Sequence, residues 1–174
     1  LATDAPQRFS HFLSTALFCR VNPGKVHLIA GQGDAQEICQ QYADLLAEAP
    51  IDAVCLGIGE NGHLAFNDPP VADFHDPAVI KPVTLDDICR QQQVNDGCFA
   101  RLEDVPARAL TLTIPTLMRA ARLFCIVPGA SKRQAVTSTL YDPLSTACPA
   151  TILRRHPDCT LYTDADACAE VTVD

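Results

Sequence analysis

One short stretch of the sequence, residues 57–70, gathers side chains that can move protons beside a small ligand. His63 can change its charge near neutral pH, and Asn61 and Asp68 are close enough in sequence to orient its ring or hold it charged. Gly57 opens the stretch and lets the backbone approach a ligand closely. The pattern predicts acid–base chemistry centred on His63. The alternative is a structural histidine whose ring is satisfied by the backbone of its own loop.

The same stretch formally matches the glycine pattern of dinucleotide-binding loops through Gly57, Gly59 and Gly62. That pattern needs a helix directly after the glycines to receive the pyrophosphate. Here Pro69 and Pro70 cut off any helix almost at once, so the sequence argues against a dinucleotide. We expect no organic cofactor and no metal.

A second candidate site follows the apolar run 123–127, which is typical of a buried strand. Gly129, Ser131 and Lys132 come directly after it, and Ser131 and Gln134 have the spacing of a capping box that opens a helix. Free backbone N–H groups, a helix dipole and the Lys132 ammonium would then meet at one point. This arrangement predicts a phosphate site, and the alternative is an ordinary capped helix with an exposed lysine.

The elements that must position these residues alternate between strand and helix periods. Alternation of this kind favours an α/β fold, with a mainly parallel, doubly wound, Rossmann-like sheet and helices on both faces. In such a sheet the ends of both strands meet at one edge, so His63 and Lys132 are expected to face one ligand. The expected strands are 26–30, 51–58, 109–114, 123–127 and 159–162, and the expected helices are 9–18, 35–49, 85–94, 116–121, 131–140 and 150–155. The nearly continuous apolar run 51–58 indicates a strand buried on both faces, and 59–85 is expected to be a long irregular loop.

The net charge, the cysteine content and the length of the apolar runs indicate which partners and which location to expect. The net charge of −8 would repel a nucleic-acid backbone or an anionic membrane surface, so neither is an expected partner. Nine cysteines without a C-x-x-C pair, mostly in apolar segments, suggest buried free thiols in a reducing compartment. No apolar stretch approaches the roughly 18 residues of a membrane span. We therefore expect a cytoplasmic protein of 174 residues with one domain.

With these residues in place, the sequence resembles the glucosamine-6-phosphate deaminase (isomerase) family, which is related to the 6-phosphogluconolactonases. The central motif is the most specific part, because His63 is followed by Leu-Ala-Phe-Asn-Asp-Pro rather than by the Thr-Ala-Ser-Leu-Phe-Pro typical of the lactonases. The resemblance extends over residues 7–12, 56–70, 105–111, 129–132 and 148–153.

This resemblance implies an aldose–ketose isomerisation and deamination of glucosamine 6-phosphate, giving fructose 6-phosphate and ammonia. His63 would shuttle the proton that opens the sugar ring, supported by Asn61 and Asp68, and Lys132 would bind the phosphate. A separate aspartate would move the proton from C2 to C1. The other readings that stay open are a 6-phosphogluconolactonase-like hydrolase and a sugar-phosphate-binding protein without catalysis. A homo-oligomer is compatible with each of them.

The sequence departs from the family pattern at several positions. Many members have Asp in place of Asn61, Glu in place of Asp68, and a phosphate-binding arginine near Gln93, for which Arg90 is the nearby substitute. In the family, a glycine-rich phosphate loop and the catalytic aspartate precede the segment that resembles 9–18. We therefore expect the domain 1–174 to lack the first strands and helices of the family fold.

Overall fold

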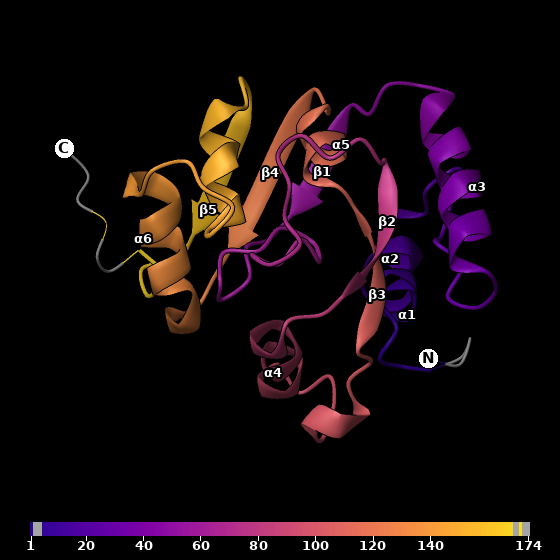
Figure 1. Ribbon diagram of the computed structural model, residues 1–174, viewed down its shortest axis with the longest axis horizontal. Helices are drawn as coiled ribbons and strands as arrows, with labels where there is room; N and C mark the ends of the chain where they lie inside the picture. Colours follow the sequence, from indigo (N-terminus) through magenta and orange to yellow (C-terminus); the bar gives the residue numbers. More distant parts are fainter. Residues whose placement is uncertain (2–4, 169–170, 172–174) are drawn as a thin grey trace.

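Two sheets organise the chain in the computed structural model, which describes residues 1, 5–168 and 171 (Figure 1). The larger sheet is parallel with the strand order β1-β4-β5, and the smaller is an antiparallel pair of β2 and β3. The strands are β1 (Ala53–Leu56), β2 (Ile80–Thr84), β3 (Arg108–Leu112), β4 (Arg122–Val127) and β5 (Cys159–Thr163).

The helical segments surround these sheets. The first three run on from one another as α1 (Phe9–Leu13), the π-helical η1 (Ser14–Phe18) and α2 (Cys19–Val21). The others are α3 (Ala35–Ala47), α4 (Asp87–Asn95), α5 (Ile114–Met118), α6 (Arg133–Tyr141) and the 3₁₀ turns η2 (Leu102–Asp104), η3 (Ala130–Lys132) and η4 (Pro149–Arg155). Among the described residues, no helix has both the length and the apolar character needed to cross a bilayer.

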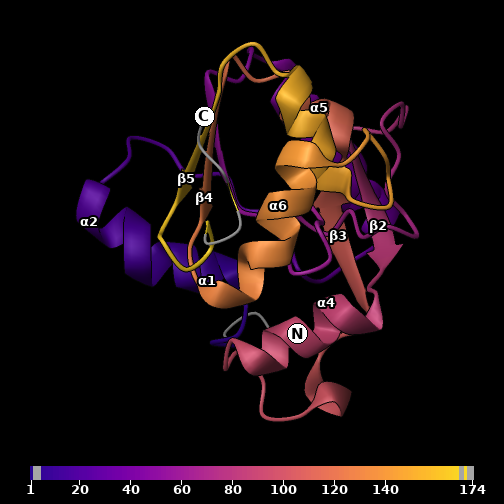
Figure 2. The ribbon, with the colours of Figure 1, turned by 90° about the vertical axis from the view of Figure 1, so that its left-hand side faces the viewer.

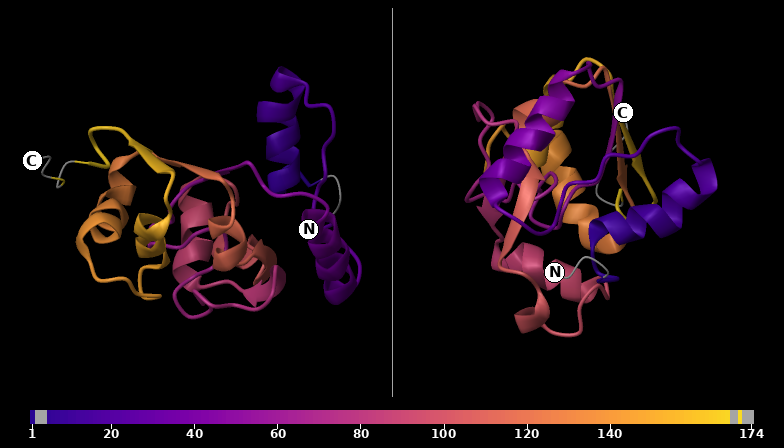
Figure 3. Two further views of the ribbon diagram at one scale, coloured as in Figure 1. Left: turned by 90° about the horizontal axis from the view of Figure 1, so that it is seen from above. Right: turned by 90° about the vertical axis from the view of Figure 1, so that its right-hand side faces the viewer.

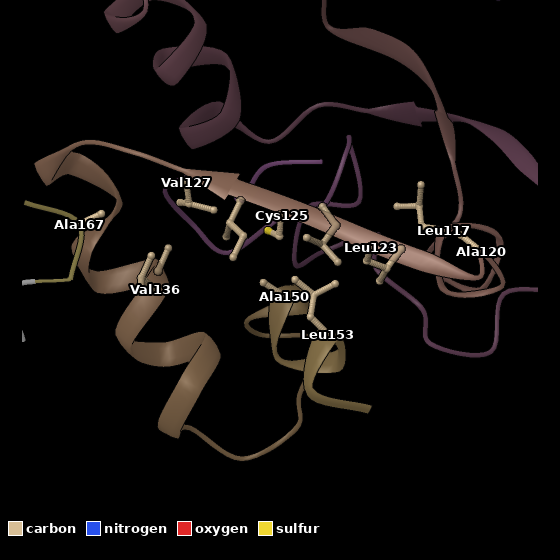
Figure 4. Packing of buried hydrophobic residues seen from close by; sticks show 12 residues of the cluster. Leu117, Ala120, Leu123, Cys125, Val127, Val136, Ala150, Leu153 and Ala167 are labelled. Carbon is tan, nitrogen blue, oxygen red and sulfur yellow. The ribbon is translucent and has the colours of Figure 1, made fainter. Parts of the chain in front are cut away.

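The main hydrophobic core lies between β4 and the helices on one face of the parallel sheet. Leu123, Cys125 and Val127 alternate along β4 and are all buried, as the two-residue period of a strand requires. Figure 4 shows these side chains directed toward Val136 of α6 and toward Ala150 and Leu153 of η4. This packing fixes α6 and η4 against the sheet.

The opposite face of the same sheet is largely open. The segment from α1 to α2 lies on that side, away from α6 (Figure 2), but Ala53 and Cys55 of β1 are exposed and Ile126 and Tyr162 are about half exposed. Seen from above, α3 and the N-terminal helices lie at the end of the molecule remote from α6 (Figure 3). The expectation that 51–58 is buried on both faces is therefore wrong, because only one face of β1 has packing partners among the described residues.

Two other local expectations are also wrong. Residues 26–30 form no strand, and Val26 and Leu28 are exposed, because the segment has no neighbouring strand to pair with in the described part of the chain. Conversely, β2 lies inside the region expected to be an irregular loop. Pro82 hid this strand from sequence analysis, because proline is typical of loops. The proline is tolerated because β2 pairs with β3 along only one edge.

The predicted fold class is confirmed as an α/β structure with a parallel sheet flanked by helices. All nine cysteines are free thiols, but their expected burial holds for only some of them. Cys39, Cys89 and Cys125 are buried, whereas Cys55 is exposed because it points to the open face of the sheet.

Candidate functional site

The two predicted sites meet at one edge of the parallel sheet. Leu56 of β1 lies opposite Cys125 of β4, so both strands end side by side. A Cβ atom on Gly57 would come within 3.3 Å of the Ile126 carbonyl oxygen, which shows how closely the loop after β1 passes β4. The expected convergence of the two strand ends is confirmed, and the carboxyl edge of such a sheet is where ligands usually bind.

His63 is buried, and its Nδ1 atom faces two acceptor oxygens. Nδ1 lies 2.7 Å from Asn61 Oδ1 and 3.0 Å from Asp68 Oδ1, while Asn61 Nδ2 donates to Asp68 Oδ1 at 3.2 Å. Since both neighbours of Nδ1 are acceptors, Nδ1 carries a proton. In the described part of the chain Nε2 has no hydrogen-bond partner, so its lone pair is free to accept a proton from a ligand.

Asp68 is fully buried and serves as the hub of this network. Its Oδ2 accepts the backbone N–H of Asp86 at 3.1 Å in addition to the contacts at Oδ1. Burial raises the pKa of the Asp68 carboxyl, but the hydrogen bond and charge of His63, followed by the bonds from Asp86 and Asn61, outweigh burial and lower the pKa below its usual range. Asp68 is therefore a carboxylate at neutral pH and accepts a hydrogen bond from the protonated Nδ1 of His63.

Two glycines of the loop are required by close packing. A Cβ atom on Gly59 would overlap the imidazole ring of His63, so only glycine leaves room for the ring. Gly62 has a φ of +81°, and a Cβ atom there would lie 2.5 Å from Cys148 Sγ. The Gly62 carbonyl also accepts the Ala150 N–H at 2.9 Å, which ties the loop to η4. Cys148 therefore packs directly against the loop.

Helix α4 forms a wall of the site that sequence reasoning missed. Asp86 caps this helix through Ile88 N–H and presents its own N–H to Asp68, while Gln92 Oε1 accepts the Glu60 N–H at 3.0 Å. Cys89 is buried beside Asp68. Burial, then the charge and hydrogen bond of Asp68 and the charge of Asp86, raise the pKa of its thiol to about 12. No motif marked these residues, and the Asp86 N-cap was the one available signal.

Lys132 lies at the start of α6 and is half buried. Burial lowers the pKa of its ammonium group, although the charges of Asp96, Glu60 and Cys89 oppose that change. These three neighbours belong to the His63 loop and to α4 or its end, so Lys132 faces the same region as His63. A cavity of ≈ 470 Å³ lies beside the loop, lined by Asn61, Gly62 and Cys148 together with residues of α6 and of 142–147.

The expected capping box at the start of α6 is wrong. Helix α6 begins at Arg133 with Lys132 as its N-cap and has no side-chain cap, because Ala130–Lys132 forms a 3₁₀ turn that shifts the helix start. Ser131 is exposed. Gly129 has a φ of +98°, and its N–H donates to both carboxylate oxygens of Asp164 at 3.1 and 2.9 Å, so that N–H is already committed.

Arg90 and Gln93 of α4 both contribute to packing around the site. The Arg90 guanidinium donates to the carbonyls of Leu102 and Val105 and pairs with Asp87, so it holds η2 against α4, although its Nε is buried without a partner among the described residues. The Gln93 side chain lies beside Cys89 and acts to lower the pKa of that thiol, against the larger effect of burial. Arg90 thus has a structural role, and Gln93 belongs to the surroundings of Cys89.

The fold and the site together define a Rossmann-like α/β protein with a histidine–carboxylate pair at the carboxyl edge of its sheet. No protein-family model matches the sequence. The glucosamine-6-phosphate deaminases of Bacillus thuringiensis (strain Al Hakam) and Bacillus cereus (strain AH820) are each 35% identical over 170 residues, which cover 95% of this chain and 63% of the relative. The chain is a homologue of the glucosamine-6-phosphate deaminases, and the resemblance is confirmed. It spans less than two thirds of the length of these relatives.

Solved structures agree with this relationship. A monomeric glucosamine-6-phosphate deaminase, described as a missing link of the NagB superfamily, has a TM-score of 0.88 at 29% identity and covers 97% of this chain and 70% of its own. A 6-phosphogluconolactonase from Shewanella baltica OS155 has a TM-score of 0.71 at 16% identity, covering 94% of this chain and 67% of its own. The second likeness establishes the shared fold alone.

Proposed function

We propose that the protein containing this chain is a glucosamine-6-phosphate deaminase, which converts glucosamine 6-phosphate to fructose 6-phosphate and ammonia. The observation that carries the proposal is the His63 ring, with a protonated Nδ1 held by Asn61 and Asp68 and a free Nε2. Homology to enzymes of that name supports the choice of substrate. The reaction needs no cofactor in this scheme.

His63 opens the sugar ring in this proposal. Nε2 accepts the proton of the anomeric hydroxyl and returns a proton to the ring oxygen, so that the pyranose becomes an open-chain aldehyde. During the transfer the imidazole carries a positive charge, which the Asp68 carboxylate stabilises. Asn61 fixes the ring through Nδ1 but carries no charge of its own.

Lys132 holds the phosphate. Its ammonium is desolvated, which strengthens its attraction for an anion, and it faces the His63 loop. Gly57 and Gly129 keep the backbone close to the ligand at the two strand ends, and Ser131 offers an exposed hydroxyl next to Lys132.

The base that moves the C2 proton belongs, in our proposal, to a further segment that packs on the open face of the sheet. Exposed apolar side chains on that side support this idea, among them Phe12 of α1, Ile126 of β4 and Tyr162 of β5. The relatives exceed this chain in length, which also supports it.

Protection of β1 amides from hydrogen exchange in the full-length protein would confirm a covered face. A second copy of the chain is the other possible occupant, and a dimer by analytical ultracentrifugation would favour it.

The deciding experiment compares two substrates with full-length protein. Ammonia release from glucosamine 6-phosphate, abolished by His63→Ala, supports the deaminase. Hydrolysis of 6-phosphogluconolactone without ammonia release would favour the lactonase alternative. Saturable binding of glucosamine 6-phosphate without turnover would point instead to a sugar-phosphate-binding protein.

We also propose a cytoplasmic location without nucleic-acid or membrane partners. The net charge of −8 and the nine free thiols support it. Fractionation of cells followed by immunodetection tests this location.

A further inference from the structure

Cys89 is a buried residue of the site that the proposed reaction does not use. Its side chain projects from α4 toward Asp68 and is only 2% exposed. One ring nitrogen of His63, one carboxylate oxygen of Asp68 and Cys89 Sγ all lie within 4.8 Å of one another, and His63 Nδ1 lies 3.0 Å from Asp68 Oδ1. Within the described part of the chain, no other group of histidine, cysteine and acidic side chains converges in this way.

We propose that His63, Asp68 and Cys89 form a binding site for a thiophilic divalent cation, with Zn²⁺ as the best fit. Imidazole nitrogen, thiolate sulfur and carboxylate oxygen are the donors that zinc uses in proteins, whereas Mg²⁺ and Ca²⁺ prefer oxygen alone. Zinc–ligand bonds of about 2.0–2.3 Å place tetrahedral ligand atoms roughly 3.3–3.8 Å apart. The His63–Asp68 pair is already at 3.0 Å, and Cys89 Sγ lies within 4.8 Å of both ligand atoms, so a small movement of the Cys89 side chain completes the set.

The charges of this site balance. A Cys89 thiolate and the Asp68 carboxylate together neutralise a dication, and a buried site must be neutral or paired to be tolerated. Asn61 Oδ1, 2.7 Å from His63 Nδ1, is a fourth donor atom and the second oxygen of the set. The Lys132 ammonium acts electrostatically on Cys89 and opposes the cation, which limits its affinity.

Metal binding exchanges protons in a defined way. The Cys89 thiol loses its proton to solvent as the metal–sulfur bond forms. The proton on His63 Nδ1 leaves that nitrogen, and the neutral ring keeps one proton on Nε2 instead. A metal-bound His63 therefore has no free lone pair at Nε2. Zinc should inhibit the proposed ring opening, and this consequence rests on the proposed function, whereas metal binding itself does not.

Cobalt provides a readout that is independent of activity. One equivalent of Co²⁺ added to the full-length protein should produce a near-ultraviolet thiolate-to-cobalt charge-transfer band, which Cys89→Ser removes. Zn²⁺ affinity, measured by competition with a chromophoric chelator, should fall at least about tenfold in Cys89→Ser and in Cys89→Ala, or about 1.4 kcal/mol. Thermal unfolding without metal confirms that both variants fold.

Two other thiols are the matched controls. Cys39→Ser removes a buried thiol of α3 and Cys98→Ser an exposed thiol beyond α4, and both variants should keep the cobalt band. An unchanged band in Cys89→Ser, or no zinc binding by the wild-type protein, would overturn the site. If zinc binds through Cys89 and leaves ammonia release unaffected, the site stands and the assigned role of His63 fails. Inhibition that a chelator reverses supports both.

Discussion

His63 and His156 are equally buried, with 8% of each residue exposed, but their rings are held by different kinds of partner. His156 Nδ1 accepts the Asp158 N–H at 3.1 Å, and Nε2 therefore carries the proton and donates to the Ala120 carbonyl at 2.9 Å. Both of its nitrogens are used by the backbone. His63 has Nδ1 held by side chains, and Nε2 has no hydrogen-bond partner in the described part of the chain.

This difference shows that burial alone does not separate a structural histidine from a chemical one. His156 joins the end of η4 to the turns before β4 and β5, so it stabilises the sheet in one protonation state. His63 is fixed in orientation by Asn61 and by a carboxylate, which leaves one nitrogen able to gain or lose a proton. A ring nitrogen without a hydrogen-bond partner is therefore the feature that distinguishes a chemically active histidine from a structural one.

The largest predicted effect is on turnover. His63→Ala in the full-length protein should lower kcat for ammonia release by roughly two to four powers of ten, because it removes the proton carrier. His156→Ala should leave kcat per folded molecule nearly unchanged. Equal losses of kcat in the two variants would contradict the distinction between a chemical His63 and a structural His156.

The carboxylate behind His63 is the next test. Asp68→Asn keeps the side-chain size but removes the charge that stabilises a protonated ring. A charged hydrogen bond contributes about 1.5–3 kcal/mol, so kcat should fall roughly ten- to a hundredfold or slightly more. Asp73→Asn, an exposed carboxylate of the same loop region, is the control and should change little.

The glycine beneath the His63 ring should be nearly as sensitive. Gly59→Ala places a methyl group where the ring lies, and overpacking of this kind costs about 1–3 kcal/mol. We expect about a tenfold loss of kcat from a displaced ring. Gly24→Ala is matched to it because nothing lies within 4 Å of the added carbon. A fully active Gly59→Ala enzyme would argue against a precisely held ring.

For the free energy of unfolding the order of the two histidines should be reversed, with the larger loss in His156→Ala and the smaller loss in His63→Ala. His156→Ala leaves the Ala120 carbonyl and the Asp158 N–H without partners, which should lower the free energy of unfolding by about 1–3 kcal/mol. Urea titration of the wild-type and variant proteins measures this change. A smaller loss than in His63→Ala would contradict the structural role of His156.

A partly buried ion pair away from both histidines should give the smallest effect. Asp76 Oδ2 lies 2.6 Å from Lys81 Nζ. Burial raises the pKa of Asp76, but the Lys81 hydrogen bond, the Ala78 N–H and the Lys81 charge lower it overall. Since the folded pKa is below the unfolded one, the pair stabilises the fold above the unfolded value and stops doing so as pH falls through the folded value. Asp76→Asn should remove about 1 kcal/mol at pH 7 and progressively less as pH falls through the folded pKa of Asp76, as measured by urea unfolding, with no change in kcat.

Much of the secondary structure could be predicted from periodicity. The buried alternation in β4 and the amphipathic helix α3 were predicted within a few residues, because local patterns encode them. Strand β2 was missed because Pro82 signals a loop, and only pairing with β3 makes it a strand. The absent strand at 26–30 shows the converse, since an apolar segment without a partner does not form a ladder.

The sequence by itself determined the loop chemistry: His63 with Asn61 and Asp68 nearby, glycines around them, and Lys132 after a second strand. These are local features of residue type and spacing. The tertiary structure alone decided that α4 supplies the Asp86 N–H and the Cys89 thiol, that Gly129 is bound by Asp164, and that one sheet face stays open. Such contacts join residues far apart in the chain, and their energies depend on distances and burial that no local pattern contains.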